Sequence, residues 1–514
     1  MAEVAIAFVG FMGAGKSEAA RGAAAELGET AEDADELIEA ELGESIALFF
    51  EREGEAAFRE REERVALGLL ERGGLVSLGG GAIESARVRE ALRRHVGVWC
   101  RVDEEAAWER SSETGRPLAV DREAFARRLR ERLPLYEESG RVVLPEGGAE
   151  AGRLAAPWLA ALRGLPDVRM TWAPSGSGGY PAAVGAGATE LLGGREVSGR
   201  LAASRWFAIA DQEALRHHRS LLPACEAVIE VEAAEERKTL AEVERVLREL
   251  AAEGARRDDG MIAFGGGMVG DLAGFCAASY QRGVPVVQIP TTLVAQVDSA
   301  YGGKTGVDLP EAKNYVGAYH MPAAVLADPR ALATLPGAEL AAGFVEVVKT
   351  ALIAGGRLWE RVSMLDALDP AALPDVIFAC ARTKVDVVAV DERDQGGRAV
   401  LNLGHTVGHA IEAASGYSRY RHGEAVGLGL LAALRLSDAD QLRDQVRGIL
   451  DRYGLPTTLD SGIGTDEVLA AAELDKKRTA EGVGFVLLER PGEPHTGVRI
   501  DPAKVRAAVD ELGA

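Results

Sequence analysis

Cysteine is scarce in this chain, with four among 514 residues. Cys100, Cys225, Cys276 and Cys380 are far apart and form no Cys-x-x-Cys pair, which argues against a disulfide framework and a cysteine zinc site. The start of the chain also has no basic segment followed by a long apolar run, so no signal peptide is expected. Together these absences predict an unsecreted protein of the reducing cytoplasm.

Positive charge and long apolar runs are also in short supply. Lys and Arg number 58 against 80 Asp and Glu, giving a formal net charge of −22. Such an acidic chain is not expected to bind nucleic acid or anionic membranes non-specifically, so any bound phosphate needs a local site. No run reaches the roughly 18 apolar residues that a membrane span needs. Hydrophobic residues still make up 47% of the chain, enough for a sizeable core.

Strand-like and helix-like segments alternate along most of the chain. Short apolar runs such as VAIAFVG and VGVWCRV precede charged helical stretches, the pattern of a parallel α/β sheet. A stretch rich in Pro, Gly and Ser at 164–179 indicates a linker. We therefore expect three parts: an α/β domain with a parallel sheet at 1–165, a Rossmann-like α/β part at 166–338 and a mainly α-helical part at 339–514.

The clearest motif follows the first strand-like run. Residues 10–17 read GFMGAGKS and fit the P-loop pattern GxxxxGK[ST], in the required position between a strand and a helix. Gly13 and Gly15 let backbone amides surround ATP phosphates, Lys16 reaches the terminal phosphates, and Ser17 binds Mg²⁺. A purely structural glycine turn is the alternative. The motif therefore predicts a nucleotide site in the first domain.

Charged residues downstream of the P-loop indicate the group that accepts the phosphate. Asp33 and Asp35 place two carboxylates in one extended segment, suited to holding Mg²⁺ water and accepting a hydroxyl proton. Arg59, Arg116 and Arg132 add the planar forks that bind carboxylates. For any single arginine a solvated helix face is the alternative, so the joint spacing carries the prediction.

These motifs resemble shikimate kinase over nearly the whole first domain. The resemblance implies Asp35 as the base at the acceptor hydroxyl, with Asp33 supporting Mg²⁺. It implies a clamp for the shikimate carboxylate made of Arg59, Arg132, Gly80 and Gly81. It further implies Arg116 near the transferring phosphate and Arg110 beside the adenine.

One residue departs from that family pattern. Glu18 follows the P-loop serine, where threonine is usual. Its carboxylate competes with the nucleotide phosphates for the positive end of the helix dipole. A weak or inactive nucleotide-binding domain is therefore the alternative to an active kinase.

The second half carries a glycine loop and a concentration of histidines. GGGMVGD at 265–271 follows an apolar strand, although it is not the usual GxGxxG dinucleotide pattern. Three of the eight histidines are His405, His409 and His422. Helical spacing alone allows His405 and His409 as metal ligands, with Glu346 or His422 as the third. Three capping or core histidines are the alternative.

From 179 to 488 the chain resembles 3-dehydroquinate synthase, through the glycine loop, QIPTT, GGKTG, GFVEVVK, NLGHTVGH and HGE. The resemblance implies Zn²⁺ or Co²⁺ on Glu346, His405 and His422, with His409 facing the substrate. It implies NAD along Glu235, Lys238, Gly267, Gly270, Asp271, Thr291, Thr292 and Lys313. It implies a substrate pocket made of Arg282, Asp298, Lys304, Asn314, Lys349, Lys384, Arg398, Asn402 and Lys477. Arg282 is implied to act across a homodimer interface.

We therefore expect a bifunctional shikimate-pathway enzyme. One activity is ATP-dependent phosphorylation of shikimate. The other is NAD- and Zn²⁺-dependent cyclisation of a seven-carbon keto-sugar phosphate, 3-deoxy-arabino-heptulosonate 7-phosphate, to 3-dehydroquinate with loss of phosphate. Another sugar-phosphate cyclase or a metal-dependent alcohol dehydrogenase is the alternative for the second half.

Overall fold

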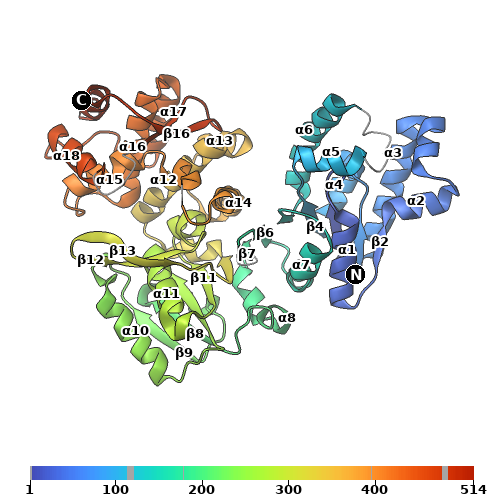
Figure 1. Ribbon diagram of the computed structural model, residues 1–514, viewed down its shortest axis with the longest axis horizontal. Helices are drawn as coiled ribbons and strands as arrows, with labels where there is room; N and C mark the ends of the chain where they lie inside the picture. Colours follow the sequence, from blue (N-terminus) through green and yellow to red (C-terminus); the bar gives the residue numbers. More distant parts are fainter. Residues whose placement is uncertain (1–2, 113–120, 177–178, 395, 477–483, 514) are drawn as a thin grey trace. The chain divides into compact units, whose positions relative to one another are not determined.

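The computed structural model describes residues 3–112, 121–176, 179–394, 396–476 and 484–513 (Figure 1). The chain forms two compact units. The first unit comprises Met1–Pro174 and Pro181–Leu201, and the second comprises Ser175–Tyr180 and Ala202–Ala514. Each unit is described by itself below. The domain limits expected from the sequence remain a prediction.

The first unit is built on a sheet with the strand order β2-β3-β1-β4-β5-β6, in which neighbouring strands pair in parallel. The strands are β1 (Ile6–Val9), β2 (Ala31–Asp33), β3 (Leu75–Ser77), β4 (Val96–Cys100), β5 (Val142–Leu144) and β6 (Arg169–Ala173), followed by β7 (Tyr180–Val184). β1 and β4 are buried along their whole length, and their sequences IAFV and VGVWC are continuous apolar runs. Such runs are typical of parallel strands covered on both faces.

The helices of the first unit are α1 (Lys16–Leu27), α2 (Ala34–Leu42), α3 (Ile46–Arg72), α4 (Ala86–Leu92), α5 (Glu104–Ser112), α6 (Arg122–Ser139), α7 (Ala149–Leu162) and α8 (Arg195–Ser198), with 3₁₀ turns η1 (Ala82–Glu84) and η2 (Ala188–Gly193). α1 and α7 pack closely because glycines face the partner backbone. A methyl group on Gly22 would overlap the Ala149 carbonyl, and one on Gly152 would overlap the Ala19 carbonyl. This packing holds the helix that follows the P-loop.

The structure differs from the sequence prediction in the segment expected to be a linker. Residues 169–173 form β6, which pairs with β5 through Val142–Met170 and Val143–Thr171. Polar residues interrupt the apolar run in this strand, and the neighbouring Pro and Gly residues dominate the composition. The Pro and Gly residues therefore indicated a turn in a segment where the structure has a short strand.

The amino-terminal part of the second unit has a parallel sheet in the order β14-β11-β10-β8-β9. Its strands are β8 (Trp206–Asp211), β9 (Ala227–Val231), β10 (Gly260–Gly265), β11 (Val286–Pro290) and β14 (Ala324–Ala327), and its helices are α9 (Gln212–His218), α10 (Leu240–Ala252) and α11 (Gly267–Ser279). Apolar side chains of α10 and α11 pack on these strands in one buried core, and Figure 1 shows both helices against the sheet. This part has the α/β architecture expected from the sequence.

The remainder of the second unit is mainly helical, as expected. Its helices are α12 (Gly337–Ala354), α13 (Gly356–Ser363), α14 (Pro374–Val390), α15 (His405–Ala414), α16 (His422–Leu436), α17 (Asp440–Arg452), α18 (Thr465–Lys476) and α19 (Pro502–Asp510). Two antiparallel hairpins pair β12 (Lys304–Leu309) with β13 (Ala312–Tyr319) and β15 (Phe485–Leu488) with β16 (Pro494–Val498). Within the described residues, none of the helices is long and apolar enough to cross a membrane.

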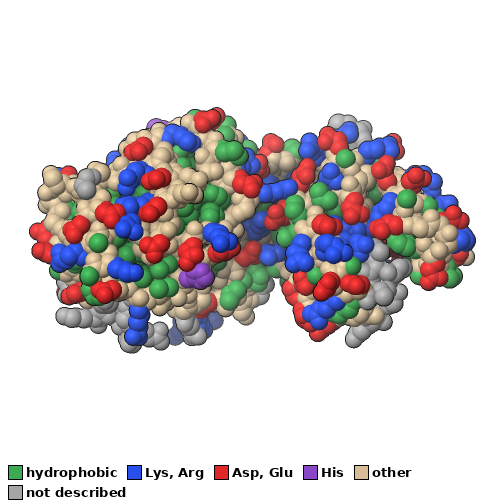
Figure 2. Space-filling view, turned by 90° about the horizontal axis from the view of Figure 1, so that it is seen from above, with side chains coloured by type: hydrophobic (Ala, Val, Ile, Leu, Met, Phe, Trp, Pro, Cys, Tyr) green, Lys and Arg blue, Asp and Glu red, His purple; other side chains and the backbone are tan. Residues whose placement is uncertain are grey.

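The surface carries both signs of charge. Figure 2 shows acidic and basic side chains interspersed over the visible face. Many of the exposed arginines form ion pairs with glutamates one helical turn away, such as Arg245 with Glu249 at 2.6 Å and Arg248 with Glu244 at 2.7 Å. Exposed pairs of this kind contribute little to stability, so the charged groups that matter for function are the buried ones.

Candidate active sites

The P-loop lies between β1 and α1, as its sequence predicts. Gly13 and Gly15 have φ angles of 75° and 70°, a left-handed conformation that favours glycine. Lys16 is buried, and its Nζ donates to the Phe11 carbonyl at 3.2 Å. The lysine is therefore held across the loop, where phosphates bind backbone amides at a helix N-terminus.

Two further residues assigned to the nucleotide lie beside the loop. Ser17 Oγ is 3.2 Å from Ser77 Oγ at the end of β3. Arg110 donates from Nη1 to the Gly13 carbonyl at 3.3 Å and from Nη2 to Glu146 at 3.1 Å. Glu18, in the first turn of α1, is exposed. Arg116 lies outside the described residues.

The triple-glycine loop after β3 lies between the P-loop and the residues predicted to bind the acceptor. A methyl group on Gly80 would lie 3.5 Å from the Gly10 carbonyl oxygen. A methyl group on Gly79 would overlap Glu62 Oε1 and lie 3.1 Å from Asp35 Oδ1. On Gly81 it would overlap the Arg59 guanidinium. The three glycines thus permit a carboxylate and a guanidinium to approach the backbone closely.

The second predicted arginine, Arg132, completes this cluster. Its Nε and Nη2 each lie 3.1 Å from a carboxylate oxygen of Glu84, and its Nη1 donates to the Gly80 carbonyl at 3.3 Å. Arg59 pairs with Glu62 at 2.5 Å and with Glu55 at 2.9 Å. The two arginines predicted to clamp the acceptor's carboxylate, Arg59 and Arg132, are therefore both brought to the glycine loop.

Glu62 is a site residue that the sequence analysis missed. It is 2% exposed, and its Oε1 accepts from the Gly81 amide at 3.2 Å. Burial raises the pKa of the Glu62 carboxyl, although the Arg59 guanidinium acts in the opposite direction. The spacing of Arg59 and Glu62, one helical turn apart, is the signal that could have found it.

Asp33 has a structural contact in addition to the role implied for it. As the N-cap of α2, its Oδ1 accepts from the Asp35 amide at 2.9 Å and the Glu36 amide at 3.4 Å. Side-chain caps of this kind satisfy amides that have no partner within the helix. The cap also fixes the position of Asp35 at the start of α2.

In the second unit, the glycine loop lies between β10 and α11. Methyl groups on Gly267 and Gly270 would lie 2.9 Å from Ser299 Oγ and from Gln288 Oε1. The amide of Thr291 donates to the Gly265 carbonyl at 2.9 Å, so the ends of β10 and β11 meet at this loop. The N-terminus of α11 has no side-chain cap, which leaves its amides available to a phosphate.

Three further residues assigned to NAD, Glu235, Lys238 and Lys313, form two charged groups, and the one around Lys238 includes Asp271 of this loop. Lys238 is 3% exposed and donates to Asp271 Oδ2 at 2.6 Å and Asn314 Oδ1 at 2.5 Å. Lys313 Nζ lies 3.4 Å from Glu235 Oε1 and 4.7 Å from the centre of the Tyr417 ring. These contacts link the α/β part to β13.

A cavity of about 620 Å³ brings most of the predicted substrate residues together. Its lining includes Asp271, Asp298, Lys304, Asn314, Lys349, Lys384, Arg398, Asn402 and His405. Tyr315 and Tyr319 of β13 also line it and were not predicted. Arg282 instead lines a second cavity of about 460 Å³ with Tyr180 and His320. Lys477 lies outside the described residues.

Lysines and aspartates form ion pairs in the first of these cavities. Asp298 pairs with Lys384 and lies 3.4 Å from Lys349 Nζ. Although burial opposes them, the two lysines hold the pKa of Asp298 well below its usual range. Burial lowers the pKa of Lys384. Lys304 pairs with Asp394, which the sequence analysis missed.

Arg398 is held by the backbone around the same cavity. It is 3% exposed, and its Nε donates to the Asp391 carbonyl at 2.6 Å. Its Nη2 donates to the carbonyls of Glu392 at 2.8 Å and Gly302 at 3.1 Å. These three bonds orient the guanidinium without neutralising its charge.

The predicted metal ligands converge from three helices. Glu346 of α12 is 1% exposed, and its Oε1 lies 3.7 Å from His405 Nε2 and 3.6 Å from His422 Nε2. Its Oε1 has no hydrogen-bond partner among the described residues. A buried carboxylate oxygen between two imidazole nitrogens is the arrangement that a cation would satisfy.

The outer ring nitrogens of the two histidines are held by neighbouring groups. His405 Nδ1 lies 3.2 Å from the Leu403 carbonyl, and His422 Nδ1 lies 3.3 Å from both oxygens of Glu412. Such partners take the Nδ1 proton and leave Nε2 for a metal. Burial, with Lys349 nearby, lowers the pKa of His405 well below its usual value, which favours the neutral imidazole that binds metals. The donor set therefore fits a zinc-type ion.

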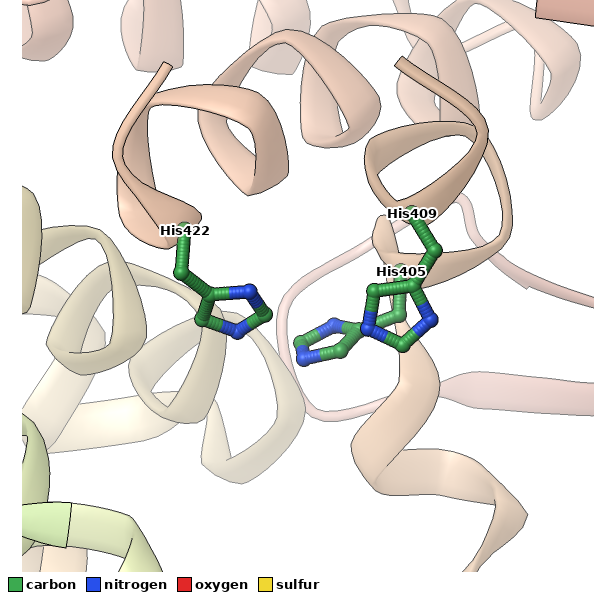
Figure 3. Close-up of side chains that lie close together, drawn as sticks. All are labelled: His405, His409 and His422. Atoms are coloured by element: carbon green, nitrogen blue, oxygen red, sulfur yellow. The ribbon is translucent and has the colours of Figure 1, made fainter. Parts of the chain in front are cut away.

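Glu412 was not predicted, although it lies seven residues after His405 and thus on the same helical face. His409, also on α15, points toward the other two histidines in Figure 3. One ligand atom from each of the three histidines lies within 4.8 Å of the others. The structure therefore gathers all three histidines that the sequence analysis singled out.

Fold and sites together define an enzyme with two centres: a P-loop phosphotransferase, and an α/β enzyme whose glycine loop suits a nucleotide and whose donor set suits a metal ion. Three family models match the chain: shikimate kinase at residues 12–163, the 3-dehydroquinate synthase N-terminal domain at 228–342 and its C-terminal domain at 343–478. This division agrees with the two resemblances recognised in the sequence.

Individual relatives lead to the same family. The chain is 41% identical to the 3-dehydroquinate synthase of Gloeobacter violaceus over 325 residues, which cover 60% of this chain and 90% of that protein. The chain belongs to the 3-dehydroquinate synthase family and carries a shikimate kinase domain ahead of the synthase domains. The predicted fold class and the prediction of a bifunctional shikimate-pathway enzyme are confirmed.

Solved structures of related cyclases share the synthase fold. A 2-deoxy-scyllo-inosose synthase complexed with carbaglucose-6-phosphate, NAD⁺ and Co²⁺ is 25% identical, with a TM-score of 0.58, covering 67% of this chain and 99% of that one. The 2-epi-5-epi-valiolone synthase of Streptomyces hygroscopicus, with NAD⁺ and Zn²⁺ bound, is 25% identical, with a TM-score of 0.55, covering 65% and 96%. Identity is thus higher to a 3-dehydroquinate synthase than to these other cyclases.

Proposed function

We propose that the first unit transfers the terminal phosphoryl group of MgATP to a hydroxyl of shikimate. The observation that carries this assignment is the meeting of Asp35, Arg59 and Arg132 at the triple-glycine loop, directly beside the P-loop. Phosphoryl transfer requires positioning and positive charge more than covalent participation by the protein. The two arginines supply a fork for the acceptor's carboxylate.

These positions support a set of roles for residues of the first unit. Lys16 and the P-loop amides bind the nucleotide phosphates, and Ser17 with Asp33 supports Mg²⁺. Asp35 accepts the proton of the attacking hydroxyl, while Arg110 lies on the nucleotide side of the P-loop. Gly80 and Gly81 bring the acceptor close to the backbone, since no Cβ intervenes.

We propose that the second unit converts 3-deoxy-arabino-heptulosonate 7-phosphate to 3-dehydroquinate. The observation that carries this assignment is the buried Glu346 Oε1, placed between the Nε2 atoms of His405 and His422 beside a cavity lined with lysines. Glu346, His405 and His422 would hold Zn²⁺, or Co²⁺ in its place. When bound, the metal polarises substrate hydroxyls, and NAD⁺ removes and returns a hydride.

The chain's own residues bind and orient the substrate around that chemistry. Lys304, Lys384 and Arg398 supply positive charge for the phosphate and carboxylate of the substrate. Asp298 holds Lys384 and Lys349 in place through the ion pairs described above. His409 faces the substrate and exchanges a proton at its imidazole. The loop at 265–271, with Lys238 and Lys313, would hold NAD.

We further propose a homodimer formed through the synthase part. Arg282 lines the smaller cavity rather than the substrate cavity. It also has a left-handed φ of 72°, a conformation that is costly for a residue with a Cβ. A second copy of the chain would give that strained arginine a substrate to bind.

We also propose a cytoplasmic location, because the cysteines are free and most of them are buried.

Two separate assays test the proposed activities on the purified chain. Shikimate with MgATP should yield shikimate 3-phosphate and ADP. The seven-carbon keto-sugar phosphate, with catalytic NAD⁺ and Zn²⁺, should yield 3-dehydroquinate and phosphate without net NADH. Net NADH formation would identify a dehydrogenase instead. ATP binding without transfer to shikimate would identify an inactive kinase domain.

A further inference from the structure

Glu84, at the end of η1, occupies the arginine fork assigned to the acceptor. Its two carboxylate oxygens each lie 3.1 Å from a nitrogen of Arg132, Nε and Nη2. Arg132 is 1% exposed, whereas the Glu84 side chain is 41% exposed. This paired geometry is the one by which an arginine binds the carboxylate of a ligand.

The same glutamate satisfies the second arginine poorly. Arg59 Nε lies 3.4 Å from Glu84 Oε2 and has no hydrogen-bond partner among the described residues. The other two guanidinium nitrogens of Arg59 are taken by Glu62 and Glu55. A carboxylate that bridged Arg132 and Arg59 Nε would therefore make one bond more than Glu84 makes.

Hydrogen bonds hold the backbone of η1 independently of the Glu84 side chain. Arg89 Nη1 donates to the carbonyls of Ile83 at 2.8 Å and Glu84 at 2.9 Å. The Glu84 amide donates to the Gly81 carbonyl at 2.9 Å. A rotation about side-chain bonds would carry the partly exposed carboxylate into solvent without disturbing the glycine loop.

We propose that Glu84 is an intramolecular competitor of the acceptor's carboxylate and thereby sets the affinity of the kinase site. It neutralises Arg132 within the chain and leaves the fork when the acceptor binds. The inference rests on the proposed kinase function, in which Arg59 and Arg132 bind shikimate. Replacing one carboxylate by another gains little Coulomb energy, so the native glutamate weakens acceptor binding.

The test compares the full-length protein with Glu84→Gln and Glu84→Ala. Shikimate affinity is measured by calorimetry, and KM and kcat are measured in the coupled kinase assay. We expect both variants to bind shikimate about three- to fivefold more tightly, the effect of one partly exposed ion pair. KM should fall by the same factor while kcat stays within about twofold.

Glu63→Gln is the matched control. Glu63 lies on α3 and accepts from Ser85 and Arg87, which follow η1, whereas its described hydrogen bonds and ion pairs include neither Arg59 nor Arg132. We expect this variant to bind shikimate as the native protein does. Thermal unfolding of each variant verifies that the kinase unit is folded.

The outcomes separate this inference from the function on which it rests. A raised KM in folded Glu84→Gln and Glu84→Ala would overturn the inference and identify Glu84 as a support for Arg132. Unchanged affinity in both would overturn it as well. If neither the native protein nor the variants bound shikimate, the proposed acceptor would be wrong and the inference would fail with it. If the variants bound shikimate and the native protein did not, the inference would be supported, because Glu84 would then exclude the acceptor completely.

Discussion

The two active sites balance their charges in opposite ways. In the kinase site, Arg59 and Arg132 are matched by glutamates of the same unit. In the synthase site, Glu346 presents a buried oxygen that no described donor satisfies, between two histidines with available Nε2 atoms. The first arrangement suits exchange of one anion for another, and the second suits capture of a cation. The way in which each site balances its charges therefore indicates the kind of ion that it binds.

The largest expected effect is on the cation site. In Glu346→Ala, His405→Ala and His422→Ala we expect loss of bound Zn²⁺ and of detectable synthase turnover, because a zinc site with an open position for substrate needs all three protein ligands. Elemental analysis of each purified variant measures the metal. Kinase activity should survive, since these residues belong to the second unit. A metal-replete His422→Ala protein would contradict the ligand set.

His409→Ala sharpens the same comparison within the histidine cluster. We expect this variant to retain its metal and to lose synthase turnover by about 100-fold or more, the usual contribution of a positioned acid–base group. Metal content and kcat measured on one preparation test both parts. The opposite result, metal loss with His409→Ala and retention with His422→Ala, would favour the pair that helical spacing alone suggests.

Gly81→Ala tests the anion site. A methyl group at this position would overlap the Arg59 guanidinium, so the arginine must move away from the acceptor. We expect KM for shikimate to rise by about 10- to 100-fold, the loss of one or more hydrogen bonds to a charged group. The affinity for ATP should change little. An unchanged KM would mean that Arg59 does not bind the acceptor.

Glu412→Gln tests the group that orients His422. The amide cannot match the carboxylate as an acceptor for the Nδ1 proton, so metal affinity should fall by about 10- to 100-fold. Competition with a chelator measures this affinity, and the synthase should regain activity at excess Zn²⁺. Failure of added metal to restore activity would assign Glu412 another role.

The sequence predicts local features of these sites better than distant ones. The P-loop and the His405–His409 pair lie within single segments, so motif and helical spacing locate them. Glu346 precedes His405 by 59 positions, and Glu84 precedes Arg132 by 48. Only tertiary packing brings such pairs together, so family resemblance found the first and nothing in the sequence indicated the second. Strand prediction depends on local sequence in the same way. β1 and β4 are continuous apolar runs and are predictable, whereas β6 contains polar residues and was missed.

The smallest expected effect concerns Glu18. This acid follows the P-loop serine, at a position where the kinase family usually has threonine. Its carboxylate lies in the first turn of α1, and its Oε2 is 4.0 Å from where a methyl group on Gly148 would lie. Removing this charge in Glu18→Thr should tighten ATP binding by about two- to fivefold, within the 0.3–1 kcal/mol typical of charges at helix ends. Because Glu18 is exposed, the gain should shrink as salt is raised. Glu123→Thr, which removes an exposed acid from the first turn of α6, is the control and should leave ATP affinity unchanged. Calorimetric titration with MgATP at two salt concentrations measures both variants. Equal or weaker binding in Glu18→Thr would show that the carboxylate lies beyond effective reach of the phosphates, so that the departure from the family pattern costs the kinase nothing.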